Sequence, residues 1–448
     1  MKRFMIAGTG SGCGKTTITC AILAALKKRG INSAAFKCGP DYIDPMFHRR
    51  AIGVESHNLD SFFCDSNTIR FLLNEYSAEV SAIEGVMGFY DGKDGSAFKV
   101  SEITDTPVVV VINCKGMSDS IGAVMSGFLG YNKPNNIVGF IFNQLPEKLR
   151  PLAEKLCNEL NTRFFGIFPR NDIHFESRHL GLVTADETVD IAEKLDILGE
   201  LAEKYLLLDD LCGLEGNSFD AKITMPVYSD ISPIIAVASD NAFCFRYSEN
   251  IDLLEKMGCK IRYFSPISDR SVPDADGLLL CGGYPELYAE KLSDNKTMLE
   301  SVKNAVKSGI PTIAECGGFM YLNKAIITND GKSFRMAGVF DSDAFSTDRL
   351  QRFGYITLKS DIDSMICQKN HSIRAHEFHY WDCTCCGNGF IAEKQDGKSW
   401  KCAYIGDNLY AGFPHLYFYS DISIAERFVE KCCERRKYGK DQKNNSHG

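Results

Sequence analysis

RFMIAGTGSGCGKTT, residues 3–17, is the segment from which the architecture of the first half of the chain follows most directly. Its mostly apolar start, residues 3–7, predicts a buried strand, and residues 18–29 predict a helix. The turn between them is rich in glycine, so backbone N–H groups can point inward at an anion beside the positive end of the helix. A strand, a glycine-rich turn, a lysine and a helix in this order indicate a nucleotide-binding loop.

The spacing of this loop is one residue longer than the usual G-x4-G-K-T pattern. The first glycine of the pattern is Gly8, whereas the usual spacing would place it at Thr9. Lys15 is expected to contact the β- and γ-phosphates, and Thr16 to offer a hydroxyl to Mg²⁺. The predicted nucleotide-binding loop comprises Gly8, Thr9, Gly10, Ser11, Gly12, Gly14, Lys15, Thr16 and Thr17.

Composition sets the broad class of the protein. A chain of 448 residues is too long for one ordinary core and suggests two domains. Its 44% hydrophobic and 24% charged residues are typical of a soluble globular protein, and a net charge of −8 argues against nucleic-acid or membrane-surface partners. No apolar run approaches the roughly 20 residues that span a bilayer, and Met1 leads directly into the first strand, so we expect a cytoplasmic protein.

The chain contains 18 cysteines, which we expect to be reduced and to serve as small buried hydrophobic residues. Cys383, Cys385 and Cys386 raise the alternative of a zinc site. Their C-x-C-C spacing matches no usual zinc knuckle, and no paired cysteine cluster follows at a suitable distance. Zinc is therefore the less favoured interpretation.

The first half of the chain alternates apolar strands with helices. Strands are predicted at residues 33–37, 81–84, 107–113, 137–143 and 164–168, and a helix at residues 148–161. The near-continuous apolar character of these strands favours a parallel sheet that is buried on both faces. The prediction is a doubly wound α/β domain with its ligands at the carboxyl ends of the strands, where Asn143 is a candidate to contact the nucleotide base.

A second α/β domain follows a looser segment rich in glycine, proline and acidic residues. Its strands are predicted at residues 234–238, 260–264, 277–280 and 311–314. The expected boundaries are a first domain at 1–206, a linker at 207–232, a second domain at 233–436 and a polar tail at 437–448.

Charged residues follow two strands of the first domain, at the edge where ligands are expected. Lys37 ends one strand and precedes Asp41 and Asp44; Glu84 ends another and precedes Asp91. Lys37 offers a second positive charge to a triphosphate, and Asp41 and Glu84 offer the oxygen ligands that Mg²⁺ prefers. Asp44 and Asp91 are candidates to orient a substrate or activate a nucleophile, although both also fit ordinary turn positions.

A candidate nucleophile stands in the second domain. In IPTIAECGGFMY, residues 310–321, a strand ends at Cys316 and two glycines follow. A sharp turn from strand to helix holds a nucleophile exposed at the top of a sheet, and glycine neighbours avoid steric conflict there. The backbone N–H groups of Gly282, Gly283 and Gly317 are expected to form an oxyanion hole.

The base that serves this cysteine should be a histidine. His376 and His379 lie in RAHEFHY, residues 374–380, and His415 lies in GFPHLYF, residues 412–418. The residue pattern leaves all three open.

The order of motifs along residues 1–430 resembles the cobyrinate a,c-diamide synthase family. The motifs are GTGSGCGKTT (8–17), FKCGPDYIDPMFH (36–48), EGVMGFYDG (84–92), SRHLGLV (177–183), ASDNAFCFRY (238–247), LCGGYPE (280–286), AECGGFMYL (314–322) and HEFHY (376–380), with a late histidine. The resemblance implies a dethiobiotin-synthetase-like ATP domain, which accounts for the longer loop, followed by a class I glutamine amidotransferase domain.

The resemblance also implies a reaction. The c and then the a carboxylate of a cobyrinate-type tetrapyrrole would become amides, with ATP and Mg²⁺ activating each carboxylate as an acyl phosphate. Cys316 would release ammonia from glutamine through a thioester. Asp41, Glu84 and Asp91 are implied to serve Mg²⁺ or the reacting carboxylate, and Tyr42 and Asp44 to lie at the tetrapyrrole end.

His415 aligns with the base of the family, but two departures are visible, both at Tyr417. The glutamine amidotransferase triad usually has a Glu two residues after its histidine; this family often lacks that acid, so His415 works without it or is oriented by another group. Many members of the family also have a second histidine at this position. The alternatives are the same chemistry on hydrogenobyrinate or nickel sirohydrochlorin, or a P-loop switch protein with an inactive second domain. The intact nucleophile turn argues against the switch, and a homodimer stays open.

Overall fold

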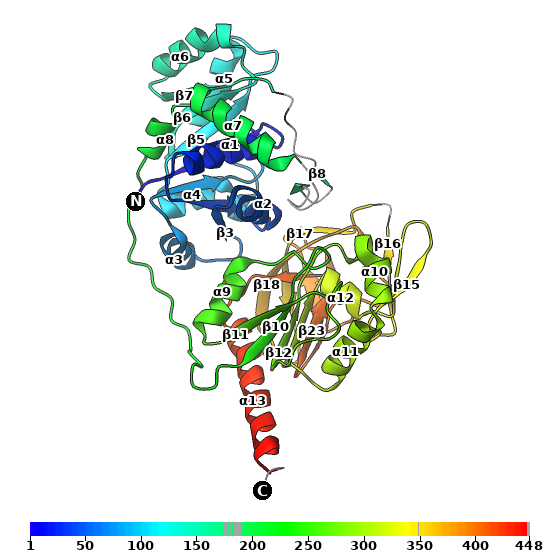
Figure 1. Ribbon diagram of the computed structural model, residues 1–448. Coiled ribbons are helices and arrows are strands. Elements are labelled where there is room, and N and C mark those ends of the chain that lie inside the picture. Colours follow the sequence, from blue (N-terminus) through cyan, green and yellow to red (C-terminus); the bar gives the residue numbers. More distant parts are fainter. Residues whose placement is uncertain (172, 174–176, 179–180, 183–189, 348, 446–448) are drawn as a thin grey trace. The chain divides into compact units, whose positions relative to one another are not determined.

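The computed structural model describes residues 1–171, 173, 177–178, 181–182, 190–347 and 349–445. The chain divides into two compact units, Met1–Ile223 and Thr224–Gly448, and each contains its own α/β sheet (Figure 1). The expectation of two α/β domains in series is confirmed. Among the described helices, none combines the length and the apolar character that a membrane crossing requires.

The first unit is built on a seven-stranded parallel sheet with the order β3-β2-β4-β1-β5-β6-β7. Its strands are β1 (Arg3–Gly8), β2 (Ser33–Cys38), β3 (Glu55–Leu59), β4 (Val80–Glu84), β5 (Val108–Asn113), β6 (Ile137–Asn143) and β7 (Arg163–Phe168). Every residue of β1 is buried, as is nearly all of β5, so both faces of the sheet are covered. The strand order changes direction at β1, which places a ligand crevice at the carboxyl end of that strand.

Helices alternate with these strands, as a doubly wound fold requires. They are α1 (Lys15–Lys28), α2 (Ile43–Phe47), α3 (Ser66–Tyr76), α4 (Ala97–Thr104), α5 (Ser120–Tyr131), α6 (Arg150–Glu159), α7 (Ile191–Tyr205) and α8 (Leu208–Cys212). Two further short strands, β8 (Ser177–Arg178) and β9 (Gly181–Leu182), pair with each other. They belong to the SRHLGLV motif, the rest of which lies outside the described residues.

Strand β3 was not predicted from the sequence, because its residues ESHNL are mostly polar. All but the first of them are nevertheless buried. Asn58 shows why this is tolerated: its Nδ2 donates to the carbonyl oxygens of Gly39 and Asp41, at 2.9 and 2.6 Å. A buried polar strand therefore anchors the turn after β2, which carries several predicted site residues.

The segment expected as a linker, residues 207–232, begins inside the first unit. Leu208 and Leu211 of α8 are buried in the core of that unit. The backbone N–H of Arg3 donates to the carbonyl oxygen of Leu214 at 3.0 Å. Farther on, Asn74 Nδ2 donates to the carbonyl oxygen of Phe219 at 2.8 Å. The first unit therefore extends beyond residue 206.

The second unit contains a six-stranded sheet with the order β11-β10-β12-β13-β23-β22. Its strands are β10 (Ile234–Ala238), β11 (Lys260–Phe264), β12 (Gly277–Leu280), β13 (Thr312–Glu315), β22 (Tyr404–Gly406) and β23 (Leu409–Gly412); all pairs are parallel except β22 with β23. The helices of this unit are α9 (Ser248–Lys256), α10 (Ala289–Asp294), α11 (Lys296–Lys307), α12 (Gly317–Leu322) and α13 (Ser423–Asn445).

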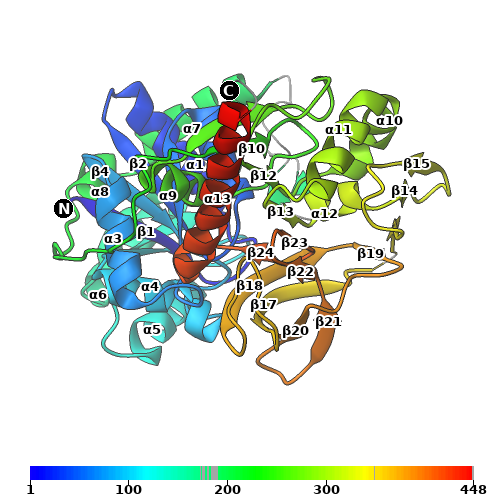
Figure 2. The same cartoon turned by 90° about the horizontal axis from the view of Figure 1, so that it is seen from below.

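Two further sheets between α12 and α13 were not predicted from the sequence. One has the order β21-β20-β17-β18-β24, with all pairs antiparallel, and the other has the order β15-β14-β16-β19 (Figure 2). The strands are β14 (Ala325–Ile327), β15 (Ser333–Arg335), β16 (Asp343–Ser346), β17 (Arg352–Lys359), β18 (Ser372–His379), β19 (Trp381–Cys383), β20 (Phe390–Glu393), β21 (Ser399–Cys402) and β24 (His415–Leu416). Many are short or partly exposed, so they lack the continuous apolar signal of a buried parallel strand.

Helix α13 continues through residues 437–445, which were expected to form a polar tail. Polar residues extend an existing helix readily, since each added residue contributes one more backbone hydrogen bond to a nucleus that has already formed.

Candidate active site

The predicted nucleotide-binding loop joins β1 to α1. Gly8 ends the strand, residues 9–14 form the turn, and Lys15, Thr16 and Thr17 begin the helix. Gly14 has φ 101°, a conformation that favours glycine, and a Cβ there would lie 2.2 Å from Asn143 Nδ2. The predicted strand, glycine turn and helix are confirmed.

Asn143, at the end of β6, braces this loop. Its Nδ2 donates to the carbonyl oxygen of Cys13 at 2.8 Å. The amide predicted to contact a nucleotide base thus also holds the backbone that would surround the phosphates.

Lys15 and Thr16 both have partners within the site. Lys15 is buried, and its Nζ donates to the carbonyl oxygen of Gly10 at 3.0 Å. The hydroxyl of Thr16 donates to Glu84 Oε1 at 2.6 Å. The first turn of α1 is thereby linked to the carboxyl end of β4.

Lys37 lies between two buried carboxylates. Its Nζ is 2.5 Å from Asp44 Oδ2 and 2.7 Å from Glu84 Oε1. Burial alone would lower the pKa of Lys37, but the charges of Asp44 and Glu84 outweigh it and raise that pKa well above its usual value. The lysine expected to contact a triphosphate is therefore already paired in this structure.

The two carboxylates respond to Lys37 differently. Burial opposes ionisation of Asp44, but the charge of Lys37 outweighs it and lowers the pKa of that carboxyl. For Glu84, burial dominates and raises the pKa despite the same lysine. Asp41 has a pKa raised to about 7, through burial and the nearby charge of Asp44.

Tyr42 and Asp44 belong to the short segment that opens α2, and both are buried. Asp41 Oδ1 accepts from the backbone N–H of Ile43 at 2.8 Å, which fixes the start of this helix. Asp41, Asp44 and Glu84 therefore lie together at one edge of the sheet, as predicted from the sequence.

His48 is a neighbour of the site to which the sequence assigned no role, although it closes the FKCGPDYIDPMFH motif. Its Nδ1 lies 3.1 Å from Ser56 Oγ, and its Nε2 lies 3.9 Å from Glu84 Oε2. Burial lowers the pKa of His48 to about 4, so the ring is neutral at physiological pH.

The residues around Glu84 fit Mg²⁺ with a nucleotide. Glu84 Oε2 is buried and makes no hydrogen bond with a described residue, and the Thr16 hydroxyl lies beside the same carboxylate. Oxygen donors of this kind suit Mg²⁺, which takes its other ligands from phosphates and water. Across the described ranges, no group of three His, Cys, Asp or Glu side chains is placed to hold a metal by itself.

Asp91 lies at a cavity beside the loop. Its Oδ2 accepts from the backbone N–H of Gly88 at 3.0 Å, and the N–H of Phe89 donates to the carbonyl oxygen of Gly8 at 2.9 Å. The cavity has a volume of about 480 Å³. It is lined by Thr9 of the loop, by Gly88, Phe89, Tyr90 and Asp91, and by Ala123, Val124, Gly127, Phe128 and Tyr131 of α5.

In the second unit, Cys316 forms the sharp turn between β13 and α12. Its φ of 46° and ψ of −104° are strained for a residue with a side chain. A Cβ on Gly318 would lie 2.0 Å from the carbonyl oxygen of Leu280, so a side chain cannot be accommodated there. The predicted sharp turn from strand to helix, with Cys316 followed by two glycines, is confirmed, and the role of Cys316 as the nucleophile stays a prediction.

The other predicted glycines lie close to this turn. A Cβ on Gly317 would be 2.9 Å from the backbone N of Gly283, which shows how near the two backbones are. A Cβ on Gly282 would be 2.7 Å from His415 Cε1. Their part in an oxyanion hole stays a prediction, and their closeness to Cys316 and His415 supports it.

His415 is the histidine that the structure pairs with Cys316. Its Nδ1 lies 3.4 Å from Glu315 Oε2. Burial alone would lower the pKa of His415, but hydrogen bonds with Cys316 and Glu315 outweigh it and raise that pKa to about 10. The imidazole therefore holds its proton at neutral pH.

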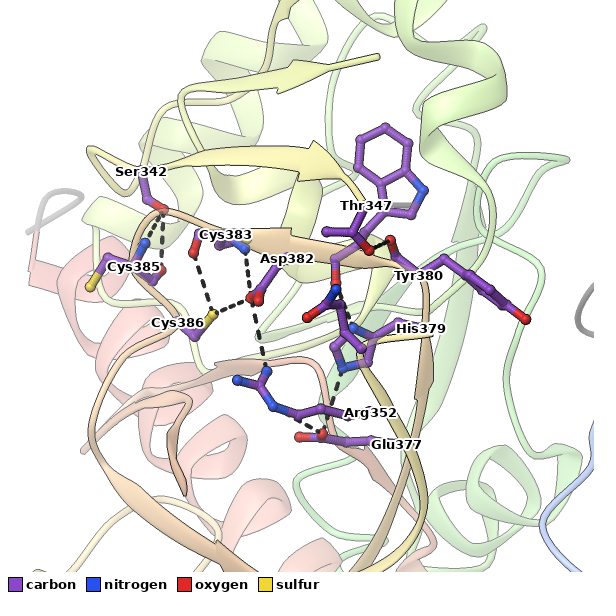
Figure 3. Close-up of polar contacts among 12 residues, drawn as sticks. Ser342, Thr347, Arg352, Glu377, His379, Tyr380, Asp382, Cys383, Cys385 and Cys386 are labelled. Atoms are coloured by element: carbon purple, nitrogen blue, oxygen red, sulfur yellow. Dashed lines mark hydrogen bonds and ion pairs between the residues drawn. The ribbon is translucent and has the colours of Figure 1, made fainter. Parts of the chain in front are cut away.

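The other two candidate histidines have different surroundings. His379 Nδ1 lies 2.6 Å from the carbonyl oxygen of Trp381, and its Nε2 lies 3.5 Å from Glu377 Oε2 (Figure 3). Burial lowers the pKa of His376 to about 3, and its Nδ1 has no hydrogen-bond partner among the described residues. Of the three histidines, His415 is the one that makes a hydrogen bond with Cys316, so it best fits the group that exchanges a proton with the reacting atoms.

Two of the three cysteines considered for zinc, Cys383 and Cys386, are hydrogen-bonded to each other through their side chains. Cys386 Sγ donates to Asp382 Oδ1 at 3.2 Å, while the backbone N–H of Cys385 donates to Ser342 Oγ at 3.1 Å (Figure 3). Cys383 is buried and Cys385 is exposed. All 18 cysteines are free thiols and most are buried, as expected for small hydrophobic residues.

Each of the two units matches a known protein family. Residues 4–182 match the family model of the CobQ/CobB/MinD/ParA nucleotide binding domain, and residues 234–421 match that of the CobB/CobQ-like glutamine amidotransferase domain. The two matches correspond to the loop site and to the cysteine site.

Full-length relatives carry both units. The chain is 37% identical to the cobyrinate a,c-diamide synthase of Fusobacterium nucleatum subsp. nucleatum, over 95% of this chain and 99% of that protein. It is 37% identical to the one from Caldanaerobacter subterraneus subsp. tengcongensis (96% and 98% covered) and 34% identical to the one from Priestia megaterium (98% and 99%). With this identity along nearly its whole length, and with a nucleotide-type loop and a Cys–His pair in the matching units, the chain belongs to the cobyrinate a,c-diamide synthase family.

Proposed function

We propose that this chain uses ATP and glutamine to convert the c and then the a carboxylate of cobyrinate into amides. The observation that carries the proposal is the presence of two complementary sites in one chain. One unit has a loop for phosphates beside buried carboxylates, and the other has a strained cysteine paired with a histidine. Carboxylate activation and nitrogen supply are the two halves of this reaction.

The first unit would activate the acceptor carboxylate. An oxygen of that carboxylate attacks the γ-phosphorus of ATP, and the bond between this phosphorus and the β–γ bridging oxygen breaks. The products are an acyl phosphate and ADP. Loop N–H groups and Lys15 would hold the phosphates. Thr16 and Glu84 would hold Mg²⁺, which when bound neutralises charge on the phosphates. Lys37 keeps Asp44 ionised beside the site.

The second unit would release ammonia. The sulfur of Cys316 attacks the amide carbon of glutamine, with N–H groups at Gly283 and Gly317 facing the developing oxyanion. His415 would give its proton to the departing nitrogen as the C–N bond breaks. Water then hydrolyses the thioester to glutamate, while ammonia displaces phosphate from the acyl phosphate.

We place the tetrapyrrole at the cavity beside Asp91. This cavity is lined by Thr9 of the loop and by aromatic side chains, including Phe128 and Tyr131 of α5. A flat macrocycle with peripheral carboxylates fits such a cavity, because its body contacts aromatic surface while one carboxylate reaches the loop.

Mass spectrometry of products tests the proposal. Purified protein is incubated with ATP, Mg²⁺, glutamine and one tetrapyrrole, in three separate reactions. The tetrapyrrole is cobyrinate, hydrogenobyrinate or nickel sirohydrochlorin. We expect two successive carboxylate-to-amide changes on cobyrinate. Faster conversion of either alternative would reassign the substrate, and no amidation of any tetrapyrrole would refute the proposal.

A further inference from the structure

The acid that orients His415 is not at the usual position. Two residues after the histidine stands Tyr417, which is fully buried and packs edge-on against Tyr247 at 4.9 Å between ring centroids. A phenol in an aromatic environment cannot supply a carboxylate. The fold must orient this imidazole by another group, or leave it without an acidic partner.

We propose that Glu315, the residue immediately before the nucleophile, is the carboxylate that positions His415. Its Oε2 lies 3.4 Å from His415 Nδ1, and its Oε1 accepts from the backbone N–H of Leu416 at 3.1 Å. Both oxygens of one buried carboxylate are therefore directed at two successive residues of β24. The proposal rests on the glutaminase role assigned above to Cys316.

This contact divides the imidazole as a catalytic triad does. Since Nδ1 faces Glu315, the ring nitrogen left for Cys316 is Nε2. In a triad, the acid fixes the tautomer and orientation of the histidine and stabilises its protonated form. Here the acid and the nucleophile are neighbours in sequence, at the end of β13, so one strand end contacts both sides of the base.

The segment around His415 is held on several sides. Asn250 of α9 donates from Nδ2 to the carbonyl oxygen of Leu416 and accepts from the N–H of Phe418, both at 2.8 Å. The Tyr410 hydroxyl donates to the carbonyl oxygen of Pro414 at 2.7 Å. These contacts fix the backbone, whereas Glu315 also contacts the ring itself.

Two strands bring titratable groups to the ring of His415. From β13 it faces Glu315 and Cys316, and from β18 it faces His376, which is opposite His415 in the strand pairing. His376 is neutral at physiological pH, so Glu315 is the carboxylate that favours the imidazolium.

The test compares Glu315→Gln with a matched control in the intact chain. Glu377 is also a buried glutamate near a histidine, with Oε2 3.5 Å from His379 Nε2, so Glu377→Gln makes the same chemical change at another pair of the same unit. We expect E315Q to lower glutaminase kcat by roughly 10²- to 10⁴-fold, the range for loss of an orienting carboxylate, and E377Q to leave it nearly unchanged. Ammonia-dependent amidation should survive in both.

The pH profile separates positioning from mere folding. Activity that needs protonated His415 falls on the alkaline side, and without Glu315 this fall should move to lower pH. Iodoacetamide should also alkylate Cys316 more slowly in E315Q, and Glu315→Asp should restore part of the rate. Unchanged kcat and an unchanged pH profile in E315Q would overturn the proposal. If E315Q does not fold, E315D takes its place. A wild-type kcat and a wild-type pH profile in E315D would then overturn the proposal.

The proposed function fails in a different way. If wild-type protein hydrolyses no glutamine, or Cys316→Ala hydrolyses it equally well, the assignment of the site itself is wrong, whatever Glu315 does.

Discussion

Single glycines set the geometry around Cys316, and Gly282 offers the clearest test. A Cβ at this position would lie 2.7 Å from His415 Cε1, so Gly282→Ala should displace the imidazole from Cys316. We expect glutaminase activity to fall by roughly 10²-fold, because small misplacements of a catalytic group are costly. Gly406→Ala is the matched control, since nothing lies within 4 Å of a Cβ there. Equal activities in the two variants, measured by glutamate release, would contradict the assigned geometry.

Lys37 is a single residue on which the first site depends for charge balance. Lys37→Met would leave Asp44 and Glu84 buried without their cation, at a cost of about 3–5 kcal/mol in the free energy of unfolding. The Lys28–Glu200 pair is largely exposed, with 55% and 69% of the two side chains accessible. Lys28→Met should therefore change stability by less than about 0.5 kcal/mol. Urea unfolding followed by circular dichroism distinguishes the two variants.

The pH dependence of that difference has a defined sign. The charge of Lys37 lowers the pKa of Asp44, so the stabilisation is present above the unfolded-state pKa of Asp and is lost as the pH falls through the folded-state value. The gap between wild-type protein and Lys37→Met should thus narrow on acidification. A gap that is constant with pH would point to packing rather than charge.

At the scale of elements, helix α5 has more apolar residues than it buries. Only Ile121 and Met125 of this helix are buried, and Tyr131, which lines the cavity, is 78% exposed. Tyr131→Ala should raise KM for the tetrapyrrole several-fold and leave KM for ATP and glutamine unchanged. Tyr263→Ala removes another exposed tyrosine, which does not line this cavity, and serves as the control. A rise in the KM for ATP instead would assign the cavity to the nucleotide.

The elements also show what the sequence could predict. Strands such as β1 and β5 were found because continuous burial requires continuous apolar sequence. Strand β3 was missed because its buried polar side chains are satisfied by hydrogen bonds that sequence periodicity does not reveal. The Glu315–His415 contact could not be predicted for another reason. Its two residues are far apart in the chain, and the strands that bring them together include strands that were not predicted.

The whole molecule combines two compact units, each with its own core and its own chemistry. This division predicts reciprocal variants. Cys316→Ala should abolish amidation with glutamine but retain amidation with ammonium salts, because the acyl phosphate still forms. Lys15→Ala should abolish amidation with either nitrogen source, because the phosphates lose their cation, while glutaminase activity measured alone survives. Product masses and glutamate release report the two reactions separately.

If Cys316→Ala lost amidation with both nitrogen sources equally, the cysteine would be needed for the fold or for acceptor activation rather than for ammonia supply. If Lys15→Ala amidated normally, the loop would not hold the reacting phosphate, and the chemistry assigned to the first unit would have to be abandoned.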